Sequence, residues 1–363
     1  MKLLFTFFNP SGGMETLNRI RCKALSAWKA ECHLLYSIDG EGRKNIKDIP
    51  TFIMNDEAAI RRLIERERYD AIVVCTDVML LTLMRRIGYR GLLVFEIQGL
   101  GTLEMATSAL QHIAALVLQS ADAVLYPQTG HLKRLLPGYL PGIPHFCFDD
   151  PLDTVDFGYA AYPPKPFPIF GWVGRIEENK NWRDFLLIGA RVLNRHPEGF
   201  LWMFGDPSLG EPKEKAMFDK WVDGLQLRRK LIMHANVPHE QMADYFSIIG
   251  DSGGLLLSTS ILEGFGYAVA EAMLCRCPVL TTDSDGIRRF LEHNATGKLY
   301  ARANISQACA EAESLMSDLP LRKSIIDKAE AHIKANFSCA KYARNFFGML
   351  RKLKDVSSRT GQL

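Results

Sequence analysis

Short, almost continuous apolar runs alternate along the chain with longer stretches in which apolar residues recur every three or four positions. The short runs predict buried β-strands, and the longer stretches predict amphipathic helices. Strands without polar alternation, separated by helices, are typical of a parallel sheet covered on both faces. The predicted strands are residues 2–8, 33–37, 71–75, 92–96, 123–126, 169–173, 200–204, 231–234, 254–257 and 279–282.

The alternation stops once, in a segment that contains four prolines between residues 160 and 168. Proline lacks the amide hydrogen that a sheet ladder needs, so this segment predicts a linker. A chain of 363 residues is also too long for one hydrophobic core. We therefore predict two doubly wound α/β domains, at residues 1–160 and 169–337, joined by a linker at 161–168. Residues 319–353 have a helical pattern.

Composition excludes several classes of protein. The net charge is only +3, and Lys and Arg are dispersed, so the chain carries no footprint for nucleic acid. The eight cysteines include no CxxC pair, which indicates a reduced, intracellular protein without a disulfide framework. Cys275 and Cys277 are too close in sequence for the usual zinc spacing, and we expect no metal. No apolar stretch is long enough to span a membrane, so we expect a soluble or peripheral protein.

Ligands of doubly wound sheets bind at the carboxyl ends of the strands, so the loops there are the candidate sites. Gly12 and Gly13 follow the first strand, where a tight turn into a helix favours an anion. Arg175 and Lys180 follow the first strand of the second domain, and two cations there could neutralise a diphosphate. The alternatives are a plain turn at the glycines and a solvated charged loop at the two cations.

The stretch from Leu262 to Met273 reads LEGFGYAVAEAM. Glu263 falls in a loop after a predicted strand, and Glu271 falls about one turn into an apolar helix. A carboxylate buried there needs partners, and the two hydroxyls of a ribose would supply them. The alternative is that Glu271 points to solvent.

These residues are where the sequence resembles a known family. Two glutamates separated by seven residues, within EGFG and EAM and followed by CPVLTT, resemble the signature of retaining glycosyltransferases of family 4. The spacing from Gly174-Arg175 to Lys180 is similar to the phosphate-binding pair of that family. The resemblance covers most of the chain and is strongest from about 170 to 300. It implies the GT-B fold, with two Rossmann-like domains facing a central cleft and a final helix, about 338–355, that crosses back to the first domain.

The resemblance also implies roles for individual residues. Glu271 would bind the ribose of a nucleotide-sugar, and Glu263 would hold a hydroxyl of the transferred sugar. Arg175 and Lys180 would clamp the diphosphate, and with Glu263 they form the implied catalytic group. The implied donor-binding residues are Gly12, Gly13, Arg175, Lys180, His234, Val237, Glu263, Gly264, Phe265, Gly266, Tyr267 and Glu271.

The sequence departs from the family pattern at several places. Relatives carry a histidine after the fourth strand of the first domain, and Gln98 occupies that place here, as a tentative contact on the sugar or acceptor side. Relatives also have glycine where Arg276 stands, and a later glutamate near the place of Arg289. These departures concern the identity of the sugar and leave the diphosphate clamp intact.

The expected activity is the retaining transfer of a sugar from a nucleoside diphosphate sugar to an acceptor hydroxyl, without metal or other cofactor. A UDP-sugar is the expected donor and a GDP-sugar the second choice. The expected acceptor is a glycan or a lipid-linked or other envelope acceptor in polysaccharide biosynthesis. The expected location is the cytoplasm, with peripheral membrane contact through Arg85-Arg86, Lys133-Arg134 and 351–354 as one option. The alternatives are a nucleotide-sugar-binding subunit without transfer activity and a GT-B-type epimerase or phosphorylase. The sequence does not indicate an oligomeric state.

Overall fold

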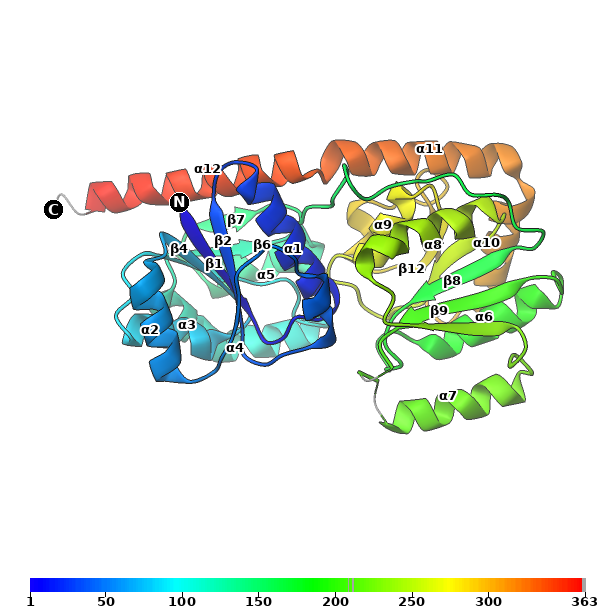
Figure 1. Ribbon diagram of the computed structural model, residues 1–363, viewed down its shortest axis with the longest axis horizontal. Helices are drawn as coiled ribbons and strands as arrows, with labels where there is room; N and C mark the ends of the chain where they lie inside the picture. The colour runs from blue at the N-terminus through cyan, green and yellow to red at the C-terminus, as the bar shows by residue number, and fades with distance from the viewer. Residues whose placement is uncertain (208, 211, 361–363) are drawn as a thin grey trace. The chain divides into compact units, whose positions relative to one another are not determined.

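The chain divides into two compact units (Figure 1). The computed structural model describes residues 1–207, 209–210 and 212–360. Unit 1 comprises Met1–Asp153 and Phe337–Leu363, and unit 2 comprises Thr154–Asn336. The proline-rich segment 161–168 therefore lies within unit 2, ahead of its first strand.

Unit 1 is built on one parallel sheet of seven strands, in the order β3-β2-β1-β4-β5-β6-β7. The first six strands follow the usual Rossmann order, in which the chain reverses direction across the sheet after the third strand. The strands are β1 (Lys2–Phe7), β2 (Glu31–Tyr36), β3 (Thr51–Ile53), β4 (Ala71–Cys75), β5 (Leu92–Glu96), β6 (Ala123–Tyr126) and β7 (His145–Cys147).

Helices cover both faces of this sheet. One apolar cluster joins one face to α2, α3, α4 and α5, and a second joins the other face to α1 and α12. The buried strands are mostly apolar because each face meets helices. Thr6, His33 and Glu96 are the buried polar exceptions in β1, β2 and β5. The helices are α1 (Gly12–Ser26), η1 (Glu41–Asn45), α2 (Glu57–Glu67), α3 (Val78–Arg86), α4 (Leu103–Ser120), α5 (Gly130–Tyr139) and α12 (Cys339–Thr360).

The helix α12 reaches unit 1 from the other end of the sequence. Its Phe346 ring lies 5.7 Å from that of Phe5 in β1, and Phe347 stacks on Trp28 after α1. Leu152 donates its amide hydrogen to the carbonyl of Phe337 at 2.7 Å, where the chain returns to unit 1. The core of unit 1 is therefore completed by residues from both ends of the chain.

Unit 2 repeats the same plan with six parallel strands, in the order β10-β9-β8-β11-β12-β13. The helices α6, α7 and α10 pack on one face, while α8 and α9 contact the other. The strands are β8 (Ile169–Val173), β9 (Phe200–Gly205), β10 (Leu231–Ala235), β11 (Leu255–Ser258), β12 (Val279–Thr282) and β13 (Lys298–Tyr300). The helices are α6 (Trp182–Leu193), α7 (Pro212–Gly224), α8 (His239–Asp251), α9 (Tyr267–Leu274), η2 (Ile287–Arg289), α10 (Ile305–Ser317) and α11 (Leu319–Asn336).

The two doubly wound α/β units predicted from the sequence are thus confirmed. In unit 2 the strand order reverses between β8 and β11, which are direct neighbours. The loops that leave two adjacent parallel strands in opposite directions create a crevice at that edge of a sheet. Arg175 and Lys180 follow β8, and Glu263 follows β11, so the fold brings these loops together.

Candidate functional site

Lys180 and Glu263 meet at the reversal point of unit 2. The Lys180 Nζ lies 2.6 Å from Glu263 Oε1, and both side chains are largely shielded from solvent. Asn179 ties the two loops together, because its side chain accepts from the amide of Leu262 and donates to the carbonyl of the same residue. Its own carbonyl accepts from the amide of Ile261 at 2.8 Å. Lys180 and Glu263, which the sequence analysis assigned to one site, are therefore in contact. The two loops that carry them are joined by hydrogen bonds of Asn179.

Arg175 occupies the same β8 loop but has a different partner. Its Nη2 lies 3.1 Å from Glu177 Oε1, and about half of its side chain is exposed. Gly174 is needed beside it, because a Cβ there would stand 2.7 Å from the ring of Trp172. A Cβ added to Gly205, at the end of the neighbouring strand β9, would likewise clash with the carbonyl oxygen of Gly174. The two expected cations therefore lie in one loop. Lys180 is paired with Glu263 and largely shielded, whereas Arg175 is about half exposed to solvent.

Two glycines shape the loop around Glu263: Gly266 within the EGFG stretch and Gly286 in the next loop. Gly266 has a φ of +90°, and it precedes the first residue of α9. From the next loop Gly286 approaches so closely that a Cβ on it would lie 2.4 Å from the carbonyl oxygens of Glu263 and Gly264. Phe265 and Tyr267 are buried, with their ring centroids 4.9 Å apart. Their side chains belong to the core, so only their backbone remains to line a ligand.

Glu271 lies inside α9 and is buried, which excludes the alternative that it points to solvent. Its Oε1 lies 2.7 Å from Nε2 of His239, the first residue of α8. The His239 ring also packs against Phe157, at 4.9 Å between centroids. The sequence predicted that a buried Glu271 needs a hydrogen-bond partner. It did not identify His239 as that partner, because His239 lies 32 residues away on another helix.

His234 and Val237 lie at the end of β10 and in the loop beyond it. The His234 ring stacks on Phe204 at 4.8 Å and packs against Trp202 and Tyr245. Burial lowers the pKa of His234, so the neutral imidazole is favoured. Val237 is half-buried in the loop between β10 and α8. The loop predicted to meet the nucleotide base therefore follows an aromatic cluster.

In unit 1, Gly12 and Gly13 form the exposed first turn of α1. Gly12 has a φ of +58°, which a residue with a side chain would adopt only with strain. The side chain of Ser11, which precedes the helix, makes no capping hydrogen bond. The first amides of α1 are thus not capped by the Ser11 side chain. Uncapped amides at a helix start are what an anion-binding site requires.

Gln98 belongs to a buried polar network that sequence reasoning missed. Its Nε2 donates to Asp150 Oδ1 at 2.9 Å and to Glu96 Oε1 at 3.1 Å. Glu96 is paired in turn with Arg21 of α1, at 2.6 Å between Nη1 and Oε2, and both are completely buried. Arg21 also donates to Asn18 and lies 4.1 Å over the ring of Phe5.

Two carboxyl groups share this network with a single guanidinium. Burial, and secondly the charge of Glu96, raise the pKa of Asp150 to about 8. Hydrogen bonding from Gln98 and the charge of Arg21 oppose that shift. The protonated form of Asp150 is therefore favoured at neutral pH. Glu96 is paired with Arg21, so the network need not hold two buried carboxylates against one guanidinium.

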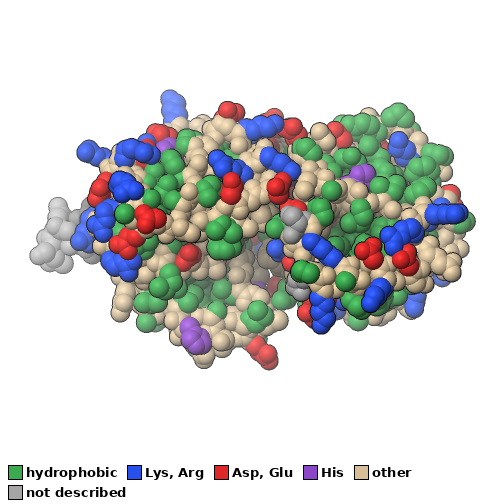
Figure 2. All heavy atoms as spheres, turned by 60° about the horizontal axis from the view of Figure 1, so that its bottom comes forward, with side chains coloured by type: hydrophobic (Ala, Val, Ile, Leu, Met, Phe, Trp, Pro, Cys, Tyr) green, Lys and Arg blue, Asp and Glu red, His purple; other side chains and the backbone are tan. Residues whose placement is uncertain are grey.

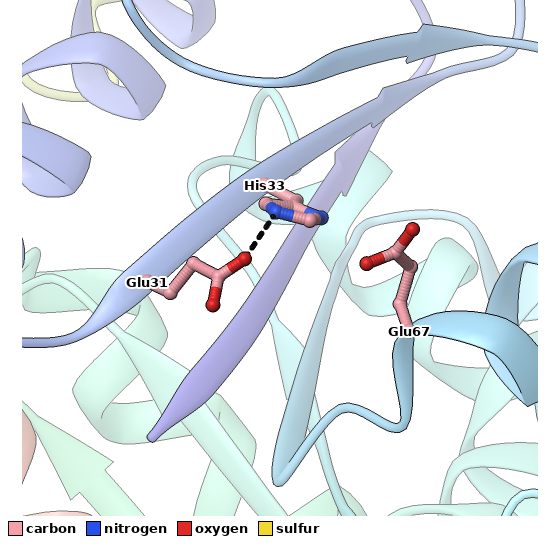
Figure 3. A group of neighbouring side chains, drawn as sticks. All are labelled: Glu31, His33 and Glu67. Carbon is pink, nitrogen blue, oxygen red and sulfur yellow. Dashed lines mark hydrogen bonds and ion pairs between the residues drawn. The ribbon is translucent and has the colours of Figure 1, made fainter.

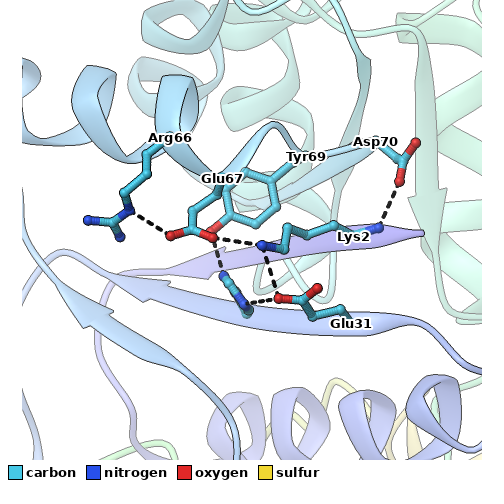
Figure 4. Close-up of polar contacts among 7 residues, drawn as sticks. Lys2, Glu31, Arg66, Glu67, Tyr69 and Asp70 are labelled. Carbon is cyan, nitrogen blue, oxygen red and sulfur yellow. Dashed lines mark hydrogen bonds and ion pairs between the residues drawn. The ribbon is translucent and has the colours of Figure 1, made fainter.

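Among the described residues, one group of side chains has the spacing of metal ligands. Glu31, His33 and Glu67 place their ligand atoms within 4.8 Å of one another (Figure 3). The ammonium of Lys2 already joins the two carboxylates, at 3.0 Å from Glu31 and 2.7 Å from Glu67 (Figure 4). The His33 ring is held between Tyr69 and Glu31. A divalent cation would have to displace Lys2, so we assign this cluster as an ion-pair network at the amino ends of β1 and β2.

The basic pairs considered for membrane contact have mixed surroundings. Arg85 donates to Asp122 at 2.7 Å, and Arg86 pairs with Glu57 at 2.6 Å. Lys133 and Arg134 are exposed on α5. On the face drawn in Figure 2, Lys and Arg side chains lie among Asp and Glu. Within the described part of the chain, no helix is both long and apolar enough to cross a membrane.

Part of the chain is similar in sequence to known proteins. Residues 161–332 match the model of the family described as glycosyl transferases group 1. A 2-deoxystreptamine N-acetyl-D-glucosaminyltransferase of Streptomyces fradiae is 23% identical over 164 residues, which cover 45% of this chain and 37% of that enzyme. The chain thus spans less than half the length of this curated relative.

Solved structures resemble the whole chain. A sucrose-phosphate synthase from Thermosynechococcus elongatus superposes with a TM-score of 0.81 at 16% identity, covering 98% of this chain and 100% of that one. Anabaena Alr3699/HepE, solved in complex with UDP and glucose, gives 0.79 at 18% identity, covering 97% and 100%. The two Rossmann-like units therefore have the GT-B fold. The match to the family model of glycosyl transferases group 1 falls on residues 161–332.

Proposed function

We propose that this protein is a retaining glycosyltransferase of family 4 that transfers a sugar from a nucleoside diphosphate sugar to an acceptor hydroxyl. The observation that supports it most is the contact between Lys180 and Glu263 at the reversal point of unit 2. A cation and a carboxylate side by side fit the two ends of such a donor, a diphosphate and a sugar with hydroxyl groups. Both residues fall in the segment that matches glycosyl transferases group 1.

The ion pair does not prevent Lys180 from binding phosphate. An ammonium group has three N–H donors, and the contact with Glu263 Oε1 uses one of them. The others remain for oxygens of the diphosphate, and the exposed guanidinium of Arg175 can reach the same group from its loop. Cations fixed before the reaction stabilise the charge that grows on the departing diphosphate. The second oxygen of Glu263 would accept a hydroxyl of the transferred sugar.

Retention of configuration then needs no protein nucleophile, and we assign none. In the mechanism that we propose, the leaving phosphate takes the proton of the acceptor on the same face of the sugar. Arg175 and Lys180 supply the positive charge in this scheme, so we propose activity without a metal ion. Glu271 would accept ribose hydroxyls, and the loop from His234 to Val237 would meet the base.

For unit 1 we propose two contacts with substrate. The first amides of α1, at Gly12 and Gly13, would bind an anionic group. Gln98 turns its NH₂ toward the carboxyl groups of Glu96 and Asp150, so its carbonyl oxygen faces away from them. An acceptor atom there would receive a hydroxyl of a sugar or of the acceptor substrate.

The donor that we favour is a UDP-sugar, with a GDP-sugar as the second choice. Anabaena Alr3699/HepE has been solved with UDP-glucose, which supports UDP. The relative from Streptomyces fradiae is named as a transferase of N-acetylglucosamine. The proposed acceptor is a glycan or a lipid-linked or other envelope acceptor in polysaccharide biosynthesis. We propose a cytoplasmic location, with the exposed Lys133-Arg134 pair available for contact with an anionic membrane surface.

The test is a panel of UDP-glucose, UDP-galactose, UDP-N-acetylglucosamine and GDP-mannose, incubated with the protein and mixed glycan acceptors in EDTA. We expect one donor to be consumed, with its anomeric configuration kept in the product, as read from the proton coupling in NMR. Binding of a donor without turnover would favour a binding subunit instead. An inverted product would overturn the retaining assignment, and absence of binding by every donor would overturn the proposal.

A further inference from the structure

We propose that His239 is a positioning residue, which holds the Glu271 carboxylate in the orientation that receives the ribose hydroxyls of a bound nucleotide. The inference rests on the proposed function, because it concerns the same donor site. It goes further in assigning a role to a residue outside the glutamate motif, on a different helix.

The surroundings of Glu271 leave it dependent on a specific partner. Ala270 and Ala272 on either side are completely buried, as is Leu274 at the end of α9. A carboxylate in such a helix is stable only when hydrogen bonds replace the water that it loses. The Nε2 of His239, at 2.7 Å from Oε1, supplies such a bond.

The direction of that hydrogen bond follows from the chemistry of the two groups. An ionised carboxylate only accepts, so the Nε2 of His239 must carry the hydrogen and donate it. The ring itself is held in place, since it belongs to the first residue of α8 and packs against the buried Phe157. A fixed donor therefore fixes the rotation of the carboxylate.

This arrangement leaves the Glu271 carboxylate with hydrogen-bonding capacity for a ligand. A carboxylate offers about four lone pairs on its two oxygens, and one bond from His239 uses one of them. The remaining sites can accept hydroxyl hydrogens, as a pair of ribose hydroxyls would offer. Without His239 the carboxylate would rotate, and binding would then have to order it, which weakens affinity.

The chain contains a matched pair for comparison. His196 Nε2 lies 3.1 Å from Glu313 Oε2, so a second imidazole meets a second carboxylate within unit 2. That pair joins the segment after α6 to α10, away from α9 and its glutamate. Removal of His196 therefore tests the loss of an imidazole–carboxylate contact as such, without touching Glu271.

The experiment measures dissociation constants for UDP and for 2′,3′-dideoxy-UDP by calorimetry. The probes differ only in the ribose hydroxyls. The dissociation constant of 2′,3′-dideoxy-UDP divided by that of UDP therefore reports the contact with Glu271. We expect His239→Ala to reduce this ratio by about tenfold, as the loss of hydrogen bonds to a charged group implies. His239→Gln, which retains an N–H donor of similar reach, should restore most of it, and His196→Ala should match the unchanged protein.

Two further results separate this inference from the proposed function. Glu271→Ala should abolish the discrimination; if it keeps the full ratio, the ribose contact of the proposed function is wrong. If Glu271→Ala loses the ratio but His239→Ala keeps it, the donor site stands and the role of His239 is overturned. A His239→Gln variant as impaired as His239→Ala, with an unchanged unfolding temperature, would also overturn the inference.

Discussion

At the scale of single residues, the two glutamates of one short motif have opposite surroundings. Glu263 sits in a loop beside an ammonium, whereas Glu271 is buried in a helix beside an imidazole. Arg276 shows another residue-scale adjustment, since it adopts a φ of +58°, a conformation that favours glycine. Its guanidinium bonds Glu330 and Asp327 of α11, which offsets the strain of that backbone.

A substitution of Lys180 should separate binding from chemistry. We expect Lys180→Ala to lower kcat by tenfold or more while weakening donor affinity by less, because charge on the leaving diphosphate grows in the transition state (about 1.4 kcal/mol per tenfold). Steady-state kinetics and calorimetry with the same donor provide the two numbers. Arg183→Ala is the control, since Arg183 lies in the adjoining helix α6 and pairs with Glu214 at 2.7 Å. Equal losses in kcat and affinity for Lys180→Ala would contradict the assignment.

At the scale of elements, the strands that are buried on both faces were predictable. The strands β4, β5, β6, β8 and β12 begin and end where the apolar runs do. The edge strands β3, β7 and β13 have three residues each and were not predicted, because so short a run carries no periodic signal. Asp56 caps α2, since its side chain accepts the amide hydrogen of Ala59.

The candidate site was predictable only in part. The loops at the reversal point and their charges could be read from local motifs, because the fold class places such loops together. The Arg21–Glu96 pair could not, since 75 residues separate its members and each looks like an ordinary residue of a helix or strand. The same holds for His239. Partners chosen by tertiary packing leave no trace in local sequence.

Gly286 offers a test of how one element positions another. A methyl group there would meet two carbonyl oxygens of the Glu263 loop, and backbone atoms move aside only with the whole loop. We expect Gly286→Ala to cost about 1–3 kcal/mol of stability and to weaken donor binding, as overpacking displaces Glu263. Thermal unfolding and donor calorimetry measure both effects.

The matched control is Gly158→Ala, because a Cβ at Gly158 would meet no atom within 4 Å. That variant should resemble the unchanged protein in both assays. If Gly286→Ala also binds the donor with unchanged affinity, the loop does not depend on this close approach.

At the scale of the whole molecule, two units of similar design are joined by two crossings of the chain, at 153–154 and 336–337. The buried network of unit 1 ends beside the first crossing. Two residues after Asp150, Leu152 donates its amide hydrogen to the carbonyl of Phe337 beside the second crossing.

The raised pKa of Asp150 predicts a pH dependence of unfolding. The unfolded state loses this proton near pH 4, whereas the folded state keeps it until about pH 8. The folded state thus binds more protons in that interval, and its stability falls as pH rises, by at most about 1.4 kcal/mol per pH unit. Asp150→Asn has no proton to lose, and its oxygen can still accept from Gln98.

Denaturant unfolding at pH 5 and pH 8 checks this expectation. The unchanged protein should lose more stability between these pH values than Asp150→Asn does, since all other titrating groups are common to both. Parallel profiles would show that Asp150 is already ionised in the folded state at pH 5.

The packing of α12 against β1 and α1 has a consequence for biosynthesis. Phe346 and its neighbours in α12 belong to the core of unit 1, yet the ribosome makes them only after all of unit 2. At roughly 5–20 residues per second, the first segment of unit 1 waits on the order of ten seconds or more for them. Unit 2 is the first unit whose core residues have all been synthesised. Unit 1 begins first on the ribosome, but its core is completed last. Until α12 emerges, the nascent chain carries an uncovered apolar face on β1 and α1, the kind of surface that chaperones bind.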